Sequence, residues 1–339
     1  MGKEVKMKLK QTLVLSFIAI FFFACDSEKK PDENLTPAVN NTTSSTFKLV
    51  SMPKFVPDSA YYFIEKQVNF GPRIPNTNAA QQAGDWLIEK MASYADTVYV
   101  QSFSVRAWNG DNLTGRNIIA SFNPDAERRI MLSAHWDTRP SADMDPDDRN
   151  AEMDGANDGA SGVGVLIEIG RLLVDQEFNI GIDIAFWDIE DYGASGIPDS
   201  YCYGSQHWSA NPHLEGYKAE YGILLDMVGA KGAQFRRETH STEYAYELVN
   251  QVWMIAGKLG HSEFTQLGTS TPIVDDHYYI NIIAGIPTID IIDYREYGFA
   301  PSWHTTDDNL QGIDKEVLRA AGETVLQVVF QEINEQPVF

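Results

Sequence analysis

The sequence predicts an α/β fold with three layers, in which a mixed, mostly parallel sheet is covered by helices on both faces. Five short runs rich in Ile, Val, Leu and Phe have the composition of strands buried on both faces. Segments with helical apolar spacing separate these runs, and such alternation indicates a parallel sheet. The chain shows no second linker after residue 46. We therefore expect one domain over 47–339, although the length alone would allow two.

The elements follow from the spacing of apolar residues along the chain. The segment TVYVQSFSV alternates like a strand, and NFGPRIPNT is a loop punctuated by Gly and Pro. Predicted helices cover 60–67, 79–93, 159–174, 244–258 and 315–335, and predicted strands cover 97–105, 117–122, 129–134, 180–187, 221–227 and 287–292.

The first 24 residues have the pattern of a signal peptide. MGKEVKMKLK contains four Lys and one Glu, and no charge occurs from Gln11 to Ala24. The apolar run over 13–23 is shorter than the ~20 residues that a membrane-spanning helix needs. An N-terminal core helix is the alternative interpretation.

The end of this segment predicts a lipid anchor. Phe22-Phe23-Ala24-Cys25 resembles a bacterial lipobox with Phe22 in place of the usual Leu, so we expect Cys25 to be acylated and to become the mature N-terminus. Residues 25–46 are polar and contain Pro, which is typical of a flexible tether. The expected location is a bacterial cell envelope, with the domain facing the periplasm. Cys202 is the one other Cys, predicted to be a small buried residue without a catalytic role.

The charge balance restricts the possible partners. The chain has 26 basic and 48 acidic residues, a formal net charge of −22 and a pI of about 4.6. Nucleic-acid binding relies on Lys and Arg that neutralise phosphates, so no nucleic-acid partner is expected. Seven acidic residues lie from Asp143 to Asp158, but the run lacks the Gly and the bidentate Glu of an EF-hand loop. We expect a solvated loop there, with a loose Ca²⁺ site as the alternative.

Acidic and polar residues gather after the predicted strands, where parallel sheets bind their ligands. Several carboxylates at such positions are costly to desolvate unless they are paired or bind a metal. Taken alone, Asp158 before GASGVG would be read as a helix cap, but the whole cluster predicts a bound cation. Its members are 133–138, Asp158, 188–191, Asp226, 275–277 and 303–305.

Seven motifs carry a family resemblance, namely SAHWDT, NDGASGVG, FWDIED, YGSQHW, LLDMVGA, VDDHYY and WHTTDDN. In content and order they resemble the zinc-dependent family that contains bacterial aminopeptidases and the animal-type glutaminyl cyclases, over most of 56–335. The resemblance implies a zinc exopeptidase-like fold with Asp158, Asp191 and His304 as zinc ligands and Glu190 as general acid/base. Family members often have Glu where this chain has Asp191.

The residue types agree with this assignment. Two carboxylates and one imidazole leave the fourth position of a tetrahedral zinc open, as a catalytic site requires. Glu190 adjoins Asp191 in the sequence, so one carboxylate can bind the metal while the other handles protons.

Within the family the choice lies between cyclisation and hydrolysis. The aminopeptidases bind two zincs, and their additional ligands correspond to His135 and Asp226. Cyclases resemble them at both positions yet hold one zinc. The acidic pair that begins at Asp275, and Trp303 before His304, resemble the cyclase form. This resemblance implies that Asp275 hydrogen-bonds Asp226 and so keeps Asp226 from binding a second metal. It also implies that Trp303 lines the substrate pocket. The resemblance also places His135 in this pocket. The alternative is that His135 is only a structural remnant of the second metal site.

The resemblance thus implies a glutaminyl-peptide cyclotransferase with one Zn²⁺ per chain, which converts the N-terminal Gln of peptides or proteins to pyroglutamate. Glu190, Asp275 and Asp226 are its expected catalytic residues. The alternatives are a di-zinc aminopeptidase and a non-catalytic peptide-binding envelope lipoprotein. One feature departs from the family pattern. Animal cyclases carry another pocket Trp a few residues after the acidic pair that corresponds to Glu190-Asp191, whereas residues 192–196 of this chain read YGASG.

Overall fold

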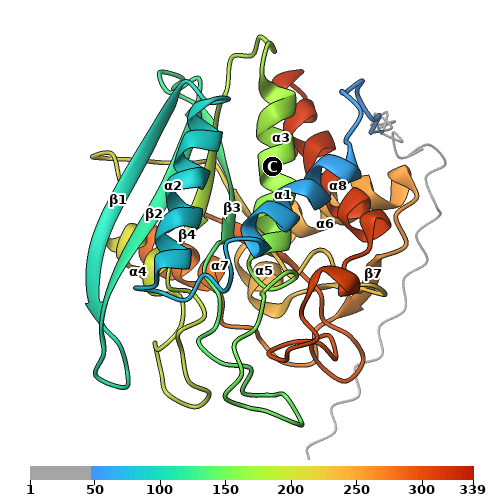
Figure 1. Cartoon of the computed structure of the whole chain (residues 1–339). Helices are drawn as coiled ribbons and strands as arrows, with labels where there is room; N and C mark the ends of the chain where they lie inside the picture. Colours follow the sequence, from blue (N-terminus) through green and yellow to red (C-terminus); the bar gives the residue numbers. More distant parts are fainter. Residues whose placement is uncertain (1–46) are drawn as a thin grey trace, which may run out of the picture. The chain divides into compact units, whose positions relative to one another are not determined.

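Six strands form the central sheet, in the order β1-β2-β4-β3-β5-β8 (Figure 1). β1 pairs antiparallel with β2, and β2 pairs antiparallel with β4, whereas β4, β3, β5 and β8 run parallel to one another. The predicted mixed, mostly parallel sheet is therefore confirmed. The strands are β1 (Thr97–Arg106), β2 (Asn112–Phe122), β3 (Arg129–His135), β4 (Gly181–Trp187), β5 (Gly222–Asp226) and β8 (Thr288–Ile292).

The structure, a computed structural model, describes residues 47–339. The predicted signal peptide and the whole predicted tether over 25–46, Cys25 included, therefore lie outside the described residues. Residues 48–339 form one compact unit. Within the described part of the chain, no helix combines the length and the apolar character needed to cross a membrane.

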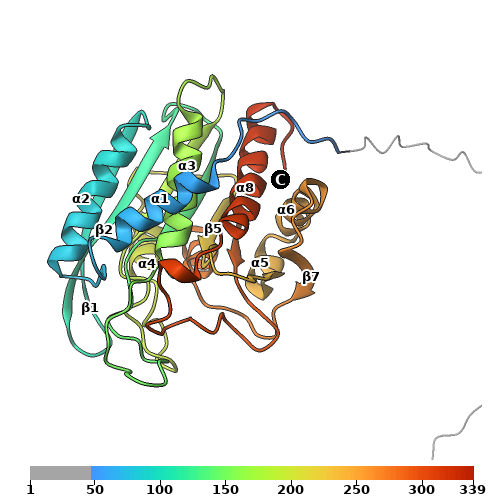
Figure 2. The same ribbon diagram turned by 45° about the vertical axis from the view of Figure 1, so that its right-hand side comes forward.

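Helices cover both faces of the sheet (Figures 1 and 2). α1, α3 and α8 pack against one another, and α2 lies beside them over β1 and β2. On the opposite face α4 contacts β2, and α7 contacts β5 and β8. The helices are α1 (Pro57–Val68), α2 (Asn78–Ala92), α3 (Ala160–Leu173), α4 (Tyr203–Ala210), α5 (Thr239–Tyr244), α6 (Tyr246–Leu259), α7 (Asp276–Tyr279) and α8 (Lys315–Ile333).

The parallel strands are buried throughout, because each lies between two helical layers. Every residue of β3, β4, β5 and β8 is buried, which explains why their sequences are continuous apolar runs. Their carboxyl ends meet at one edge of the sheet, from which long loops extend at the bottom of Figure 1. The polar residues predicted to gather after the strands are thereby brought to one edge.

The structure differs from the predicted elements in three places. β2 begins at Asn112 instead of Asn117. The helix predicted over 244–258 is α6, which begins only at Tyr246 because Ala245 leaves the helical region with φ −142°. α4, α5, α7 and the short parallel pair β6 (Phe235–Arg237) and β7 (Phe264–Gly268) were not predicted.

Candidate metal centre and active site

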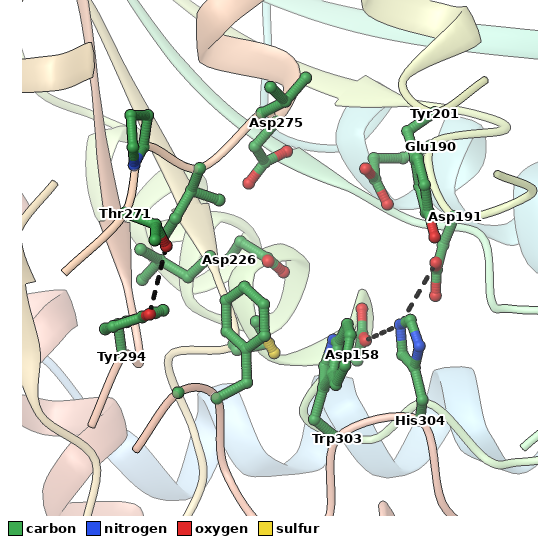
Figure 3. Close-up of a pocket in the computed structure, with 17 residues that line it drawn as sticks. Asp158, Glu190, Asp191, Tyr201, Asp226, Thr271, Asp275, Tyr294, Trp303 and His304 are labelled. Atoms are coloured by element: carbon green, nitrogen blue, oxygen red, sulfur yellow. Dashed lines mark hydrogen bonds and ion pairs between the residues drawn. The ribbon is translucent and has the colours of Figure 1, made fainter. Parts of the chain in front are cut away.

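One cavity of about 320 Å³ collects most of the predicted site residues at the carboxyl edge of the sheet (Figure 3). Acidic side chains stand around its inner part, and an aromatic and aliphatic wall faces them. Of the predicted residues, those that line it are Asp158, Glu190, Asp191, Asp226, Asp275, Trp303 and His304.

Asp158, Asp191 and His304 form a group that we call the metal-ligand group. Their ligand atoms all lie within 4.8 Å of one another, and all three residues are buried. Nε2 of His304 is 3.4 Å from Oδ1 of Asp191 and 3.7 Å from Oδ2 of Asp158. The three residues come from separate segments, since Asp158 precedes α3, Asp191 follows β4, and His304 lies between β8 and α8.

The residues of this group fit a zinc ion. Oδ2 of Asp191 is buried and has no hydrogen-bond partner within residues 47–339, so this oxygen is available to bind a metal. Burial and the negative charge of Asp191 raise the pKa of Asp158. Such a shift is expected where buried carboxylates lie close together without a compensating cation. Two carboxylates and one imidazole match a catalytic zinc site with an open fourth position.

Arg139 and Asp143 support this group from the loop that follows β3. Nδ1 of His304 lies 3.2 Å from Oδ1 of Asp143, which leaves Nε2 for the metal. Arg139 donates hydrogen bonds to both oxygens of Asp143 and, at 2.8 Å, to Oδ1 of Asp191. A carboxylate on the far nitrogen of a metal-binding His fixes its ring orientation and raises its basicity. From the sequence, Asp143 is predicted only to belong to an acidic loop.

Replacing Asp143 with Asn is expected to weaken zinc binding by about 10–100-fold, the range found when such an outer partner of a ligating His is lost. The affinity is measured by competition with a chelator of known strength. Asp147→Asn, an exposed acid of the same loop, is the matched control. Equal zinc affinity of the two variants would contradict the role given to Asp143.

Two further buried carboxylates hold the loops that carry the catalytic side chains. Asp137 accepts hydrogen bonds from the backbone N–H groups of Glu190 at 3.0 Å and Asp191 at 3.2 Å. Asp308 accepts the backbone N–H of Asp158 at 3.0 Å. Asp137 lies in the motif SAHWDT and Asp308 in WHTTDDN. No role was predicted for either acid, because a position in a motif does not show which backbone group a carboxylate contacts.

Backbone strain also marks the site. Ile189, Met227 and His304 have φ values of 56°, 50° and 56°, in the left-handed region that non-glycine residues rarely adopt. Each is a predicted site residue or adjoins one: Ile189 precedes Glu190, and Met227 follows Asp226. Such strain persists where the surrounding structure enforces it, and it is concentrated at functional sites.

Glu190 lines the cavity and has a strongly raised pKa. Burial, together with the negative charges of Asp275 and Asp191, raises its pKa well above the ordinary range, although His135 opposes the shift. A buried carboxyl with a raised pKa can both accept and donate a proton near neutral pH. The thiol of Cys202 donates a hydrogen bond to Oε1 of Glu190 at 3.1 Å. Cys202 is buried as predicted, but it contacts the proposed acid/base instead of only filling space.

The structure corrects two predictions about the second set of residues. His135 does not line the cavity; it is 2% exposed and lies beneath the acids, with Nε2 3.0 Å from Asp158 and 3.2 Å from Asp226. Asp275 does not hydrogen-bond Asp226. Instead its Oδ1 accepts the backbone N–H of Asp276, and its Oδ2 has no partner among the described residues. Both carboxylates are ionisable and buried, so a hydrogen bond between them would need a shared proton.

His135, Asp158 and Asp226 nevertheless make a second candidate metal group. Burial lowers the pKa of His135, but hydrogen bonds to Asp137, Asp158 and Asp226 outweigh this effect and raise it well above the ordinary value. In the protonated form, the His135 ring supplies a positive charge between the two acids.

The apolar wall of the cavity is formed without the additional Trp that animal cyclases carry at the position of residues 192–196. Trp303 stacks on His304 with ring centroids 3.7 Å apart, and Phe299 packs on Trp303 at 4.7 Å. Tyr192 turns away and donates its hydroxyl hydrogen bond to Asp111. Tyr201 lines the cavity instead.

The acidic loop gives no support to a calcium site. The candidate metal groups found within 47–339 include no residue from 143 to 154. Asp143 is engaged with Arg139 and His304, and Asp145 accepts hydrogen bonds from the backbone and hydroxyl of Thr306. The possible Ca²⁺ site stays an untested prediction.

Comparison with solved structures returns close matches in fold. The glutaminyl cyclase of Porphyromonas gingivalis is 49% identical, with a TM-score of 0.81, over 82% of this chain and 99% of that chain. A structure described as a leucine aminopeptidase precursor from Bacteroides thetaiotaomicron is 46% identical, with a TM-score of 0.79, over 83% and 99%. The glutaminyl-peptide cyclotransferase of Drosophila melanogaster is 25% identical over 265 residues, which are 72% of each chain.

A mostly parallel sheet with two carboxylates and a His at its edge defines the class of zinc exopeptidase-like α/β enzymes. Residues 117–329 match Peptidase family M28. The chain belongs to this family, and the resemblance inferred from the seven motifs is confirmed.

Proposed function

We propose that this protein is a zinc-dependent glutaminyl-peptide cyclotransferase, which converts the N-terminal glutaminyl residue of peptides and proteins to pyroglutamate and releases ammonia. The observation that carries the proposal is that Glu190, Asp275 and Trp303 line the same cavity as the metal-ligand group. The proposal is also supported by the 49% identity to the glutaminyl cyclase of Porphyromonas gingivalis.

The reaction closes a five-membered ring within the substrate. The α-amino nitrogen forms a bond to Cδ, the carbonyl carbon of the side-chain amide, and the bond from Cδ to the amide nitrogen breaks. The metal-ligand group would hold one zinc ion per chain, which would supply Lewis acidity to the side-chain amide carbonyl. Glu190 accepts a proton from the attacking amine and donates it to the amide nitrogen, which leaves as ammonia. The same carboxyl thereby returns to its starting state.

The other lining residues orient the substrate. Asp275 and Asp226 present carboxylates to the cavity (Figure 3), and a carboxylate oxygen of Asp275 lies within 4.8 Å of one of Glu190. There Asp275 and Asp226 can hold the nitrogen atoms of the substrate. Trp303 and Phe299 close the outer wall with aromatic surface, which limits access of water. Because attack is intramolecular, fixing the side chain in a folded conformation supplies much of the acceleration.

A zinc aminopeptidase is the second candidate, because His135, Asp158 and Asp226 form a further possible metal group. The deciding experiment combines zinc stoichiometry with turnover of reporters that begin with Gln or Leu. One zinc per chain and ammonia release from the Gln reporter are expected. Two zincs with hydrolysis of the Leu reporter would favour the aminopeptidase.

We also propose that the mature protein is attached to a bacterial cell envelope through acylated Cys25, with its catalytic domain in the periplasm. The sequence FFAC at 22–25 and the polar residues that follow support this proposal. Incorporation of labelled palmitate that is lost in Cys25→Ser is the expected result, and equal labelling of both proteins would contradict it.

A further inference from the structure

A second cavity, which we call the outer groove, adjoins the catalytic cavity. It has a volume of about 430 Å³ and shares Tyr201, Val274 and Trp303 with the catalytic cavity. One wall is the loop 194–201, and the other is Val274 with Tyr278 and Tyr279 at the end of α7. Nothing in the catalytic steps above uses this groove.

The surface of the outer groove is largely apolar. Ile197 is 41% exposed and Val274 is 51% exposed, although both are large aliphatic residues. Tyr278 and Tyr279 pack edge to face at 5.3 Å and supply aromatic surface beside them. Exposed apolar surface that continues from an active site is typical of a ligand-binding region.

The outer groove is held open by hydrogen bonds within the protein. The hydroxyl of Tyr279 donates to Oδ1 of Asp199 at 3.0 Å, which ties the loop to α7. The hydroxyl of Ser200 accepts the backbone N–H of Ala194 at 3.0 Å, and Gln206 donates to the carbonyl of Tyr201 at 2.7 Å. A binding surface formed before the ligand arrives loses less conformational entropy on binding.

We propose that the outer groove binds the side chain of the second residue of the substrate peptide and favours a large apolar or aromatic side chain there. The inference rests on the proposed cyclisation. Val274 directly precedes Asp275 and lines the catalytic cavity with it, and the proposed function assigns Asp275 to a nitrogen atom of the substrate. The part of the substrate peptide that follows the reacting residue would therefore pass Tyr201, Val274 and Trp303, which line both cavities. Asp199 on the groove wall and the net charge of −22 disfavour an acidic residue in that position.

The test compares kcat/KM for Gln-Phe-Ala, Gln-Ala-Ala, Gln-Lys-Ala and Gln-Glu-Ala, with ammonia release as the readout. The Phe peptide is expected to exceed the Ala peptide by about tenfold, the scale that one added apolar group reaches in a fitted pocket. The Glu peptide is expected to be the slowest. In Ile197→Ser the advantage of Phe over Ala should fall to about threefold or less.

Ile282→Ser is the matched control, because Ile282 is 46% exposed and lines neither cavity; it should keep the full advantage. Equal rates for Phe and Ala, a Lys peptide faster than the Phe peptide, or an unchanged ratio in Ile197→Ser would each overturn the assignment of the groove while leaving cyclisation intact. Absence of ammonia from all four peptides would instead contradict the proposed function and, with it, this use of the groove.

Discussion

Glu190→Gln is expected to lower kcat by about 10²–10⁴-fold, the usual contribution of general acid/base catalysis, while zinc stays bound. Gln has nearly the shape of Glu and can still accept the hydrogen bond from Cys202. It cannot take a proton from the attacking amine. Because Glu190 is not in the metal-ligand group, its loss removes proton transfer without removing the metal.

The measurement pairs steady-state ammonia release with zinc content by elemental analysis. Glu296→Gln is the control for the loss of one negative charge, since Glu296 is exposed and lies two residues before Gly298 of the cavity wall. It should keep near-normal kcat. A Glu190→Gln enzyme that retains zinc and more than about a tenth of normal kcat would show that another group moves the proton.

The sequence predicted the sheet and most of the acidic cluster for a physical reason. Strands buried on both faces are mostly apolar, so Asp226 at the end of β5 and Glu190 after β4 stand out against their neighbours. Parallel pairing then brings these ends together, whatever the loops between them do. Asp158, Asp191 and His304 could be assigned only through the family resemblance, because they come from separate loops.

The remaining features depend on which group each side chain reaches in three dimensions. Asp137 accepts N–H groups from residues more than 50 positions away, and no local pattern encodes such a contact. Tyr201 lines the cavity because the loop 194–201 folds back beside it. α4 is eight residues long and begins after Cys202, whose φ of 60° lies in the left-handed region; such a start carries no sequence signal like Gly or Pro.

Asp158→Asn is expected to weaken zinc binding by more than the 10–100-fold typical of outer-shell partners, and ammonia release should fall in parallel. Oδ1 of Asp158 is 3.0 Å from Nε2 of His135, and Oδ2 is 3.7 Å from Nε2 of His304. This carboxylate therefore belongs to both candidate metal groups. An amide of the same shape supplies one neutral oxygen and an NH₂ group that binds no metal, so either group would be impaired. Zinc binding as tight as in the unmodified protein would contradict the assignment of Asp158.

His135→Gln separates the two groups, because His135 belongs only to the second. With a single zinc at the metal-ligand group, this variant keeps one zinc per chain, and the lost contact with Asp158 weakens its affinity by no more than about 10–100-fold. With zinc in both groups, the stoichiometry falls from two to one. Nε2 of His135 lies 3.0 Å from Asp158 and 3.2 Å from Asp226, and contacts with these acids raise its pKa, so a second cation there would compete with a proton for Nε2. The first outcome is therefore expected.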